Sequence, residues 1–191
     1  SCEYSGRVRD AFARKGCDAW SCDFEPAETP GNHHQGDVRD LLGDPWDLLI
    51  AHPPCTFLCS SGMHWTTRGK RDPRLTDQAL EFVLMLAGQK HIRRKAIENP
   101  IGCLSTRWRK PEQIIQPWMF GHPESKATCL WLENLPVLRP TNMLPRPASG
   151  RWDNQTPSGQ NKLSPGPDRW KERSRTYQGI ADAMADQWSK A

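Results

Sequence analysis

DLLIAHPPC, residues 47–55, is the stretch that decides the fold of this 191-residue chain. Its first half contains an apolar run with no polar interruption, which is typical of a strand buried on both faces in a parallel sheet. The two prolines end that strand because proline has no backbone N–H for a strand ladder. The stretch therefore predicts a central strand of an α/β sheet, with the side chain of Cys55 held just beyond its carboxyl end.

Apolar segments on both sides of this strand complete an alternating pattern. Further strands are predicted at residues 19–24, 95–100 and 127–132. Helices are predicted where apolar residues recur at helical spacing, at residues 7–15, 76–89 and 179–187. Strands that alternate with helices predict an α/β fold with a mainly parallel sheet, in which ligands bind at the carboxyl ends of the strands.

The remaining segments predict loops within a single domain, residues 1–191. Residues 60–75 are polar and basic. Residues 136–169 are rich in Pro, Gly, Ser and Asn and predict a loop-rich insert rather than a second core. Residues 1–6 read as the end of a strand running into a glycine turn. Because the chain opens without methionine, we expect the sequence to be a fragment, with the first half of that strand upstream of Ser1.

The composition indicates a globular protein with a buried core. Hydrophobic residues make up 36% of the chain, and no apolar run reaches the roughly 18 residues of a membrane span. The net charge of +4 permits a polyanionic partner without requiring one. The seven cysteines include no C-x-x-C pair, and Cys55 and Cys59 lack the histidines that would support a metal site. We expect reduced thiols, no metal, no membrane contact and a cytoplasmic location.

The first candidate site is the glycine turn Tyr4-Ser5-Gly6, followed by acids near the ends of later strands. In a nucleotide-binding α/β fold such a turn lets the backbone approach the ligand, and a strand-end acid such as Asp23 accepts hydrogen bonds from ribose hydroxyls. Phe24 is placed to cover a purine ring, and Asp37 to accept from an exocyclic amine. A glycine in a turn is also common without any ligand.

The second candidate site combines a cysteine and an acid at two strand ends. The two prolines fix the backbone before Cys55, so its thiol is a candidate rigid nucleophile, although most free cysteines are inert and packed. Glu98, in the sequence Glu-Asn-Pro, is a candidate proton donor if burial raises its pKa. The alternative for Glu98 is an ordinary surface glutamate. Both residues are expected to face the same cleft.

Basic and aromatic residues gather in two further segments. Such mixtures suit phosphates and bases, although many charge clusters are only solvated surfaces. The first group is Trp65, Arg68, Lys70, Arg71 and Arg74, and the second is Arg107, Trp108, Arg109 and Lys110.

The linear order of these motifs resembles that of the DNA cytosine-5 methyltransferases, in particular short versions from phages and prophages. Residues 47–62 look like the family's nucleophile block running into its mobile catalytic loop, and residues 120–132 look like a later block with a basic residue. The resemblance implies a Rossmann-like fold that uses S-adenosyl-L-methionine. It implies Cys55, Glu98 and Lys126 as catalytic residues, and Tyr4, Ser5, Gly6, Asp23, Phe24, Asp37, Val38 and Pro53 as cofactor-binding residues.

The resemblance also implies duplex DNA as the partner, with the target cytosine flipped out of the helix. The segment 60–74 is then the candidate for closing over the flipped base, and the insert is the candidate reader of bases. The expected DNA-contacting residues are Ser60, Trp65, Arg68, Lys70, Arg71, Arg107, Arg109, Lys110, Arg151, Asn154 and Gln155.

This chain departs from the family pattern at several positions. Arg7-Val8 stands where the family has further glycine, Thr128 where it has a second arginine, and Gly179-Ile180 where it has Gly-Asn. The reading insert is also short. These departures leave open an enzyme acting on free cytosine nucleotides or single strands, and a non-catalytic nucleic-acid-binding module. A cysteine hydrolase ranks last because no His–Asp arrangement is evidently placed to activate Cys55.

Overall fold

The computed structural model describes residues 1–159, 161–164 and 166–190, and its largest sheet has four strands. The strand β3 (Leu48–Ala51) lies parallel to β4 (Arg94–Pro100). The strand β6 (Thr128–Glu133) lies antiparallel to β4 and to the edge strand β5 (Gln113–Ile115). The order across this sheet is β3-β4-β6-β5.

The N-terminal segment, residues 1–3, joins this sheet to a second pair of strands. The Ser1 amino group donates to the Ile50 carbonyl at 2.7 Å, and the His52 N–H donates to the Ser1 carbonyl at 2.9 Å. On the other side, the Glu3 N–H donates at 3.1 Å to the Cys22 carbonyl of β1 (Ser21–Asp23). The strand β1 in turn lies parallel to β2 (His33–Gln35).

The direction of travel across the sheet reverses beside the N-terminal segment. From there the chain goes outward to β1 and β2 on one side, and then returns to β3 and β4 on the other. In open α/β sheets, ligands bind at the carboxyl ends of the strands at such a reversal. In this fold the reversal lies between Glu3, at the end of the N-terminal segment, and His52, which follows β3.

The predicted α/β class is confirmed, but the prediction of a mainly parallel sheet holds only in part. The strands β1 to β4 pair in parallel, whereas β6 runs against both of its neighbours. Five of the six residues of β6 are buried, and only Glu133 is exposed. An apolar strand covered on both faces has the same sequence pattern in either direction, so its pattern does not reveal its direction.

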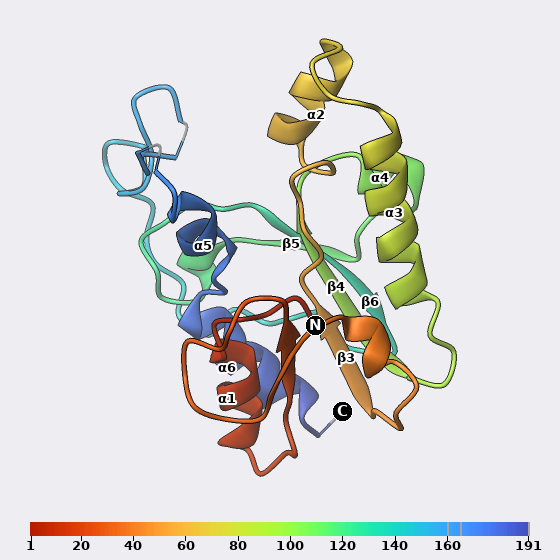
Figure 1. The fold of residues 1–191 in the computed structure, drawn as a ribbon. Helices are drawn as coiled ribbons and strands as arrows, with labels where there is room; N and C mark the ends of the chain where they lie inside the picture. Colours follow the sequence, from red (N-terminus) through yellow and green to blue (C-terminus); the bar gives the residue numbers. More distant parts are fainter. Residues whose placement is uncertain (160, 165, 191) are drawn as a thin grey trace.

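Helices cover both faces of the sheet (Figure 1). On one face α1 (Arg7–Ala13) packs against α6 (Gln178–Trp188), and on the other lies α3 (Arg74–Ala87). Because side chains alternate along a strand, β4 sends Ala96 into the first core and Ile97 into the second. Glu98 follows Ala96 toward α6, so the two faces of β4 carry different sites.

Several short elements differ from the predictions. Residues 60–75 were expected to form a loop, but α2 (Ser60–Thr67) is a helix that projects away from the sheet (Figure 1). The helices α4 (Leu104–Arg107) and α5 (Arg169–Ser174) were not predicted, nor were β2 and β5. All of them are short and mostly polar or exposed, so they lack the apolar periodicity on which the predictions depended.

The described residues of the insert 136–169 contain no strand and no helix before Arg169, as the composition predicted. The insert is anchored by Trp152, which is buried and stacks on Trp118 with ring centroids 5.8 Å apart. No helix in the described part of the chain is long and apolar enough to cross a membrane.

Candidate active site

Three buried polar atoms at the carboxyl edge of the sheet have no hydrogen-bond partner among the described residues. They are Glu3 Oε2, His52 Nε2 and Asn99 Oδ1. They belong to the N-terminal segment, the residue after β3 and the last residues of β4, which are neighbours in the sheet. Leaving such a group unpaired costs about 1–3 kcal/mol, so a cluster of them at this edge of the sheet marks a candidate functional site.

The backbone around Cys55 is fixed from two directions. The Asn99 amide donates to the Pro53 carbonyl at 2.8 Å, which ties β4 to the segment after β3. The backbone N–H groups of Leu58 and Cys59 then donate to the Cys55 carbonyl at 3.0 and 2.9 Å. The half-buried Cys55 thiol is therefore held on a closed turn at the end of β3, as the two prolines predicted.

Cys55 and Cys59 interact through a hydrogen bond between their side chains. That bond, together with contacts from the Ser61 hydroxyl and the Gly62 N–H, lowers the pKa of Cys59 to about 5. The same bond and burial raise the pKa of Cys55. Cys59 is the N-cap of α2, where helix N–H groups favour a thiolate. These contacts therefore favour a thiolate on Cys59 over one on Cys55, whereas the sequence pointed to Cys55 alone.

Glu98 lies close to a histidine that was not selected as a site residue. Its Oε2 is 3.3 Å from Nδ1 of His52, and both side chains are mostly buried. Burial alone would raise the pKa of Glu98, but the hydrogen bond and charge of His52, the charge of Lys126 and a hydrogen bond from Thr128 together lower it. The expected raised pKa is therefore wrong, because these partners together outweigh the effect of burial.

Lys126 completes this cluster. Its ammonium donates to the Arg173 carbonyl at 2.8 Å and lies 5.9 Å over the ring of Tyr177. Its charge acts on both Cys55 and Glu98, and the charge of Glu98 acts on Cys55. The three residues predicted as catalytic are therefore close enough to interact electrostatically. A cavity of about 20 Å³ adjoins Lys126 and Glu98, enough for roughly one water molecule.

The glycine turn is built on a buried carboxylate. Gly6 has a φ of 73°, and a Cβ there would lie 2.3 Å from Thr29 Oγ1, so only glycine fits. Glu3 accepts through Oε1 from the Ser5 hydroxyl and the Arg7 N–H, while Oε2 remains unpartnered among the described residues. Glu3 therefore offers an acceptor to a ligand, a role that the sequence analysis did not assign.

The other predicted cofactor residues differ in what they can offer. Asp23 is the last residue of β1, and its Oδ1 accepts from the Glu25 N–H. Phe24, the next residue, is 73% exposed. Asp37 accepts from the Arg39 backbone N–H through Oδ1 and from the Arg39 guanidinium through Oδ2, and both hydrogen bonds lower the pKa of Asp37. Val38 is buried in the core, so its side chain supports the site rather than facing a ligand. Pro53 is also buried.

A C-terminal segment, residues 169–176, lies over the glycine turn. The Tyr4 hydroxyl donates to the Lys171 carbonyl at 2.5 Å, so the Tyr4 side chain points toward α5. Two ion pairs fasten the segment to the loop after β1, Lys171 with Glu25 at 2.7 Å and Arg175 with Glu28. This segment covers the predicted cofactor turn. The sequence instead predicted that residues 60–74 close over the site.

The first basic group is carried by the projecting α2 and the loop that follows it. Arg68 and Lys70 are exposed, and Lys70 lies 5.2 Å over the ring of Trp65. Arg71 is committed locally, because it donates to the Thr56 carbonyl at 3.0 Å. The Ser60 hydroxyl, at the start of α2, is also committed locally, because it donates to the Ile101 carbonyl.

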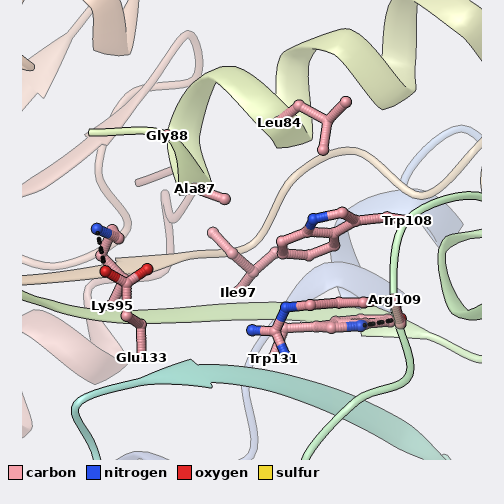
Figure 2. A pocket seen from close by; sticks show the side chains of 9 residues that line it. All are labelled: Leu84, Ala87, Gly88, Lys95, Ile97, Trp108, Arg109, Trp131 and Glu133. Atoms are coloured by element: carbon pink, nitrogen blue, oxygen red, sulfur yellow. Dashed lines mark hydrogen bonds and ion pairs between the residues drawn. The ribbon is translucent and has the colours of Figure 1, made fainter. Parts of the chain in front are cut away.

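The second basic group does not join the cluster around Cys55. Arg107 pairs with Asp77 at 2.7 Å, and Arg109 pairs with Glu112. Arg109 also stacks on Trp108 in a groove of about 300 Å³ on the α3 face of the sheet, which Figure 2 shows. That groove is lined by Lys95 and Ile97, which point away from Glu98. Lys110 is exposed.

The polar residues of the insert mostly hold the insert itself together. Asn154 donates to the Ser125 carbonyl at 2.9 Å and accepts from the Ser125 N–H at 3.0 Å, directly beside Lys126. Gln155 accepts from the Trp152 N–H at 2.9 Å. Arg151 is exposed. The insert thus positions the segment that carries Lys126.

Three site residues were missed by the sequence analysis. Glu3 stands inside a predicted strand and His52 directly before two prolines, and a polar residue in either position is a usable signal. Cys59 could not be found, because its low pKa depends on the unpredicted helix α2. No group of three or more His, Cys, Asp or Glu residues in the described ranges could hold a metal ion.

No family model and no curated protein matches the sequence. Among solved structures, the chain is similar to a crystal structure of a candidate DNA modification methyltransferase encoded within a prophage (E. coli). The TM-score is 0.46 and the sequence identity is 14%. The similarity covers 73% of this chain and 49% of the other, so the chain spans about half the length of that protein.

Proposed function

We propose that this chain is a DNA cytosine-5 methyltransferase that uses S-adenosyl-L-methionine. The observation that carries this proposal is that Glu98 and Lys126 line one cavity and that the charges of both act on Cys55. A cysteine, a carboxyl group and a cation that interact in this way supply a nucleophile, a proton donor and a charge stabiliser. These are the groups that activation of a pyrimidine ring requires.

Cys55 is the proposed nucleophile, and Cys59 is the proposed acceptor of its proton. The hydrogen bond between the two thiols lets the proton of Cys55 pass to the Cys59 thiolate as the Cys55 sulfur attacks carbon 6 of cytosine. Glu98 then delivers a proton to ring nitrogen 3, which makes carbon 5 nucleophilic. Lys126 stabilises the negative charge of this crevice.

The cofactor proposal rests on the acceptors around the glycine turn. When bound, S-adenosyl-L-methionine supplies the methyl group that carbon 5 takes. The unpartnered Oε2 of Glu3 and the carboxylate of Asp23 fit the hydroxyl and amino groups of such a molecule. Phe24 is exposed enough to cover its adenine ring. The segment 169–176 would close over it through its contacts with Tyr4 and Glu28.

Replacing Asp23 with alanine is expected to weaken cofactor binding by about 1–3 kcal/mol, or roughly 5- to 150-fold. The lost group is a charged hydrogen-bond acceptor at the end of β1. Isothermal titration calorimetry with S-adenosyl-L-methionine measures the change. Asp18→Ala, before the start of the same strand, is the matched control and should bind normally. Equal affinities for the two variants would remove Asp23 from the site.

DNA is the proposed partner through α2 and the insert. Arg68, Lys70 and Trp65 are exposed on an element that projects beside the Cys55 turn, a combination that suits phosphate and base contacts. A cytosine in a duplex must be flipped out to reach Cys55, at a cost of a few kcal/mol. The short insert, with Arg151 exposed on it, is the proposed reader of bases.

The proposal is tested by offering three substrates with labelled cofactor: random duplex DNA, the same DNA as single strands, and the free nucleotide dCMP. We expect methyl transfer to duplex DNA, and bisulfite sequencing should place the product at cytosine carbon 5. If methyl transfer is faster to single strands or to dCMP, that molecule and not duplex DNA is the substrate. Cofactor binding with no transfer to any of the three would favour the non-catalytic binding module.

A further inference from the structure

The electrostatics of Glu98 do not match the role of a simple acid. A group that delivers a proton must hold one at neutral pH. His52, Lys126 and Thr128 instead favour the carboxylate form of Glu98 by their charges and hydrogen bonds. A source of the delivered proton must therefore lie beside Glu98.

His52 has the position and the chemistry of that source. Its Nδ1 lies 3.3 Å from Glu98 Oε2, and its side chain is only 8% exposed. The rigid Pro53-Pro54 segment follows it, and its backbone N–H is bound to Ser1, so the ring has little freedom. Its Nε2 has no hydrogen-bond partner among the described residues, so no second hydrogen bond there orients the ring. Imidazole is the side chain that exchanges a proton near neutral pH.

We propose that the proton given to the substrate is stored on the His52–Glu98 pair, with His52 as the positioning residue that loads Glu98. This inference rests on the proposed function. It adds that the acid of this site is a pair of residues rather than one.

The proton and electron movements balance within the pair and the substrate. The imidazolium of His52 passes its Nδ1 proton to Glu98 Oε2, and the resulting carboxylic acid passes it to cytosine nitrogen 3. The lone pair of the Cys55 sulfur forms the bond to carbon 6. The electron pair of the C5=C6 bond then moves to C4–C5, and that of C4=N3 moves to nitrogen 3. His52 is left neutral. After methylation, the proton on carbon 5 leaves to solvent, its electron pair re-forms C5=C6, the Cys55 sulfur departs with the electron pair of its bond to carbon 6, and the proton on nitrogen 3 returns to the pair.

The other groups that face the pair do not replace it as the store. Lys126 and Tyr177 line the adjoining cavity, Lys126 as a cation and Tyr177 with its hydroxyl hydrogen-bonded to Glu124. Cys55 and Cys129 both feel the charge of Glu98, and burial helps to raise the pKa of each. Thr128 donates a hydrogen bond to Glu98 through its hydroxyl, which is not an acid or a base in this pH range. Among these groups, His52 is the one whose ring nitrogen lies within hydrogen-bond distance of Glu98 and can pass a proton to it.

The first test needs neither cofactor nor DNA. The carboxyl ¹³C resonance of Glu98, assigned with Glu98→Gln, is titrated in wild type and in His52→Asn. Asn Nδ2 can occupy the place of His Nδ1 and keep the hydrogen bond, but it carries no charge and no transferable proton. We expect the pKa of Glu98 to be higher in His52→Asn. His52→Gln is the second variant if the first does not fold, and an unmoved titration would overturn the pair.

The second test is the pH dependence of single-turnover methyl transfer. An imidazolium holds its proton to higher pH than an ordinary carboxylic acid does. The alkaline fall in rate should therefore begin at lower pH in His52→Asn, and at pH 7.5 that variant should be slower by up to the roughly 10²-fold that a positioned acid contributes.

Thr128→Val is the matched control, because it removes a hydrogen bond to Glu98 without removing a proton store. Its alkaline limb should not move to lower pH. A uniformly reduced rate with an unmoved limb in His52→Asn would show a merely structural role and overturn the inference. Absence of transfer in wild type would overturn the proposed function and with it the delivery step, even if the Glu98 titration still showed the pair.

Discussion

Replacing Cys55 with serine is expected to reduce the rate of methyl transfer to DNA by about 10⁴-fold or more. This is the usual size of the rate loss when a covalent nucleophile is removed. The hydroxyl of serine is far less acidic than a thiol, and the Cys59 thiolate is too weak a base to activate it. Single-turnover transfer of a labelled methyl group measures the loss. Cofactor affinity should be unchanged, because Cys55 does not belong to the proposed cofactor residues.

Two further variants separate this effect from a general loss of structure. Cys17→Ser, remote from the crevice, should keep wild-type activity. Cys59→Ser should be slower than wild type but measurable, because Cys55 remains and only its proton acceptor is weakened. Near-normal transfer by the Cys55 variant would show that the proposed nucleophile is not one.

Replacing Glu98 with glutamine is expected to lower the rate of methyl transfer by about 10²- to 10⁴-fold, the usual contribution of a positioned acid or base. Glutamine keeps the size of the side chain and can still hydrogen-bond, but it cannot pass a proton to nitrogen 3. Single-turnover kinetics at saturating cofactor and DNA isolates this step from binding.

The control for the Glu98 variant is Glu81→Gln, on the exposed side of α3, which should leave the rate unchanged. The melting temperature of Glu98→Gln should also stay close to that of wild type. A rate within a few-fold of wild type would mean that the ring nitrogen receives its proton from elsewhere, and would overturn both the role of Glu98 and the pair that it forms with His52.

The parts of the fold that could be predicted are those where burial leaves a strong pattern. The strands β3 and β4 and the helix α3 have continuous or periodic apolar residues, and each lies within a few residues of its predicted bounds. The strand β2 contains only two histidines and a glutamine, and α2 is largely exposed and polar. Such elements form because neighbouring parts of the chain hold them, and the local sequence does not record this.

The candidate site was predicted in its positions and not in its charges. The prolines before Cys55 and the strand that carries Glu98 place both side chains at the carboxyl edge. The protonation states depend on partners from other elements, namely His52 for Glu98 and the α2 N-terminus for the cysteine pair. The two faces of β4 likewise separate Arg109 from Glu98, and the local sequence around Arg109 does not record which face its side chain reaches.

The central claim, covalent catalysis through Cys55, is tested most directly with duplex DNA that contains 5-fluorocytosine. Fluorine at carbon 5 cannot leave as a cation, so the cysteine adduct is not eliminated. Incubation with S-adenosyl-L-methionine should give a complex that survives denaturation in wild type and in Cys59→Ser, but not in Cys55→Ser, and peptide mapping should place the DNA on Cys55. A complex mapped to Cys59, or equal trapping by Cys55→Ser, would contradict the proposed mechanism.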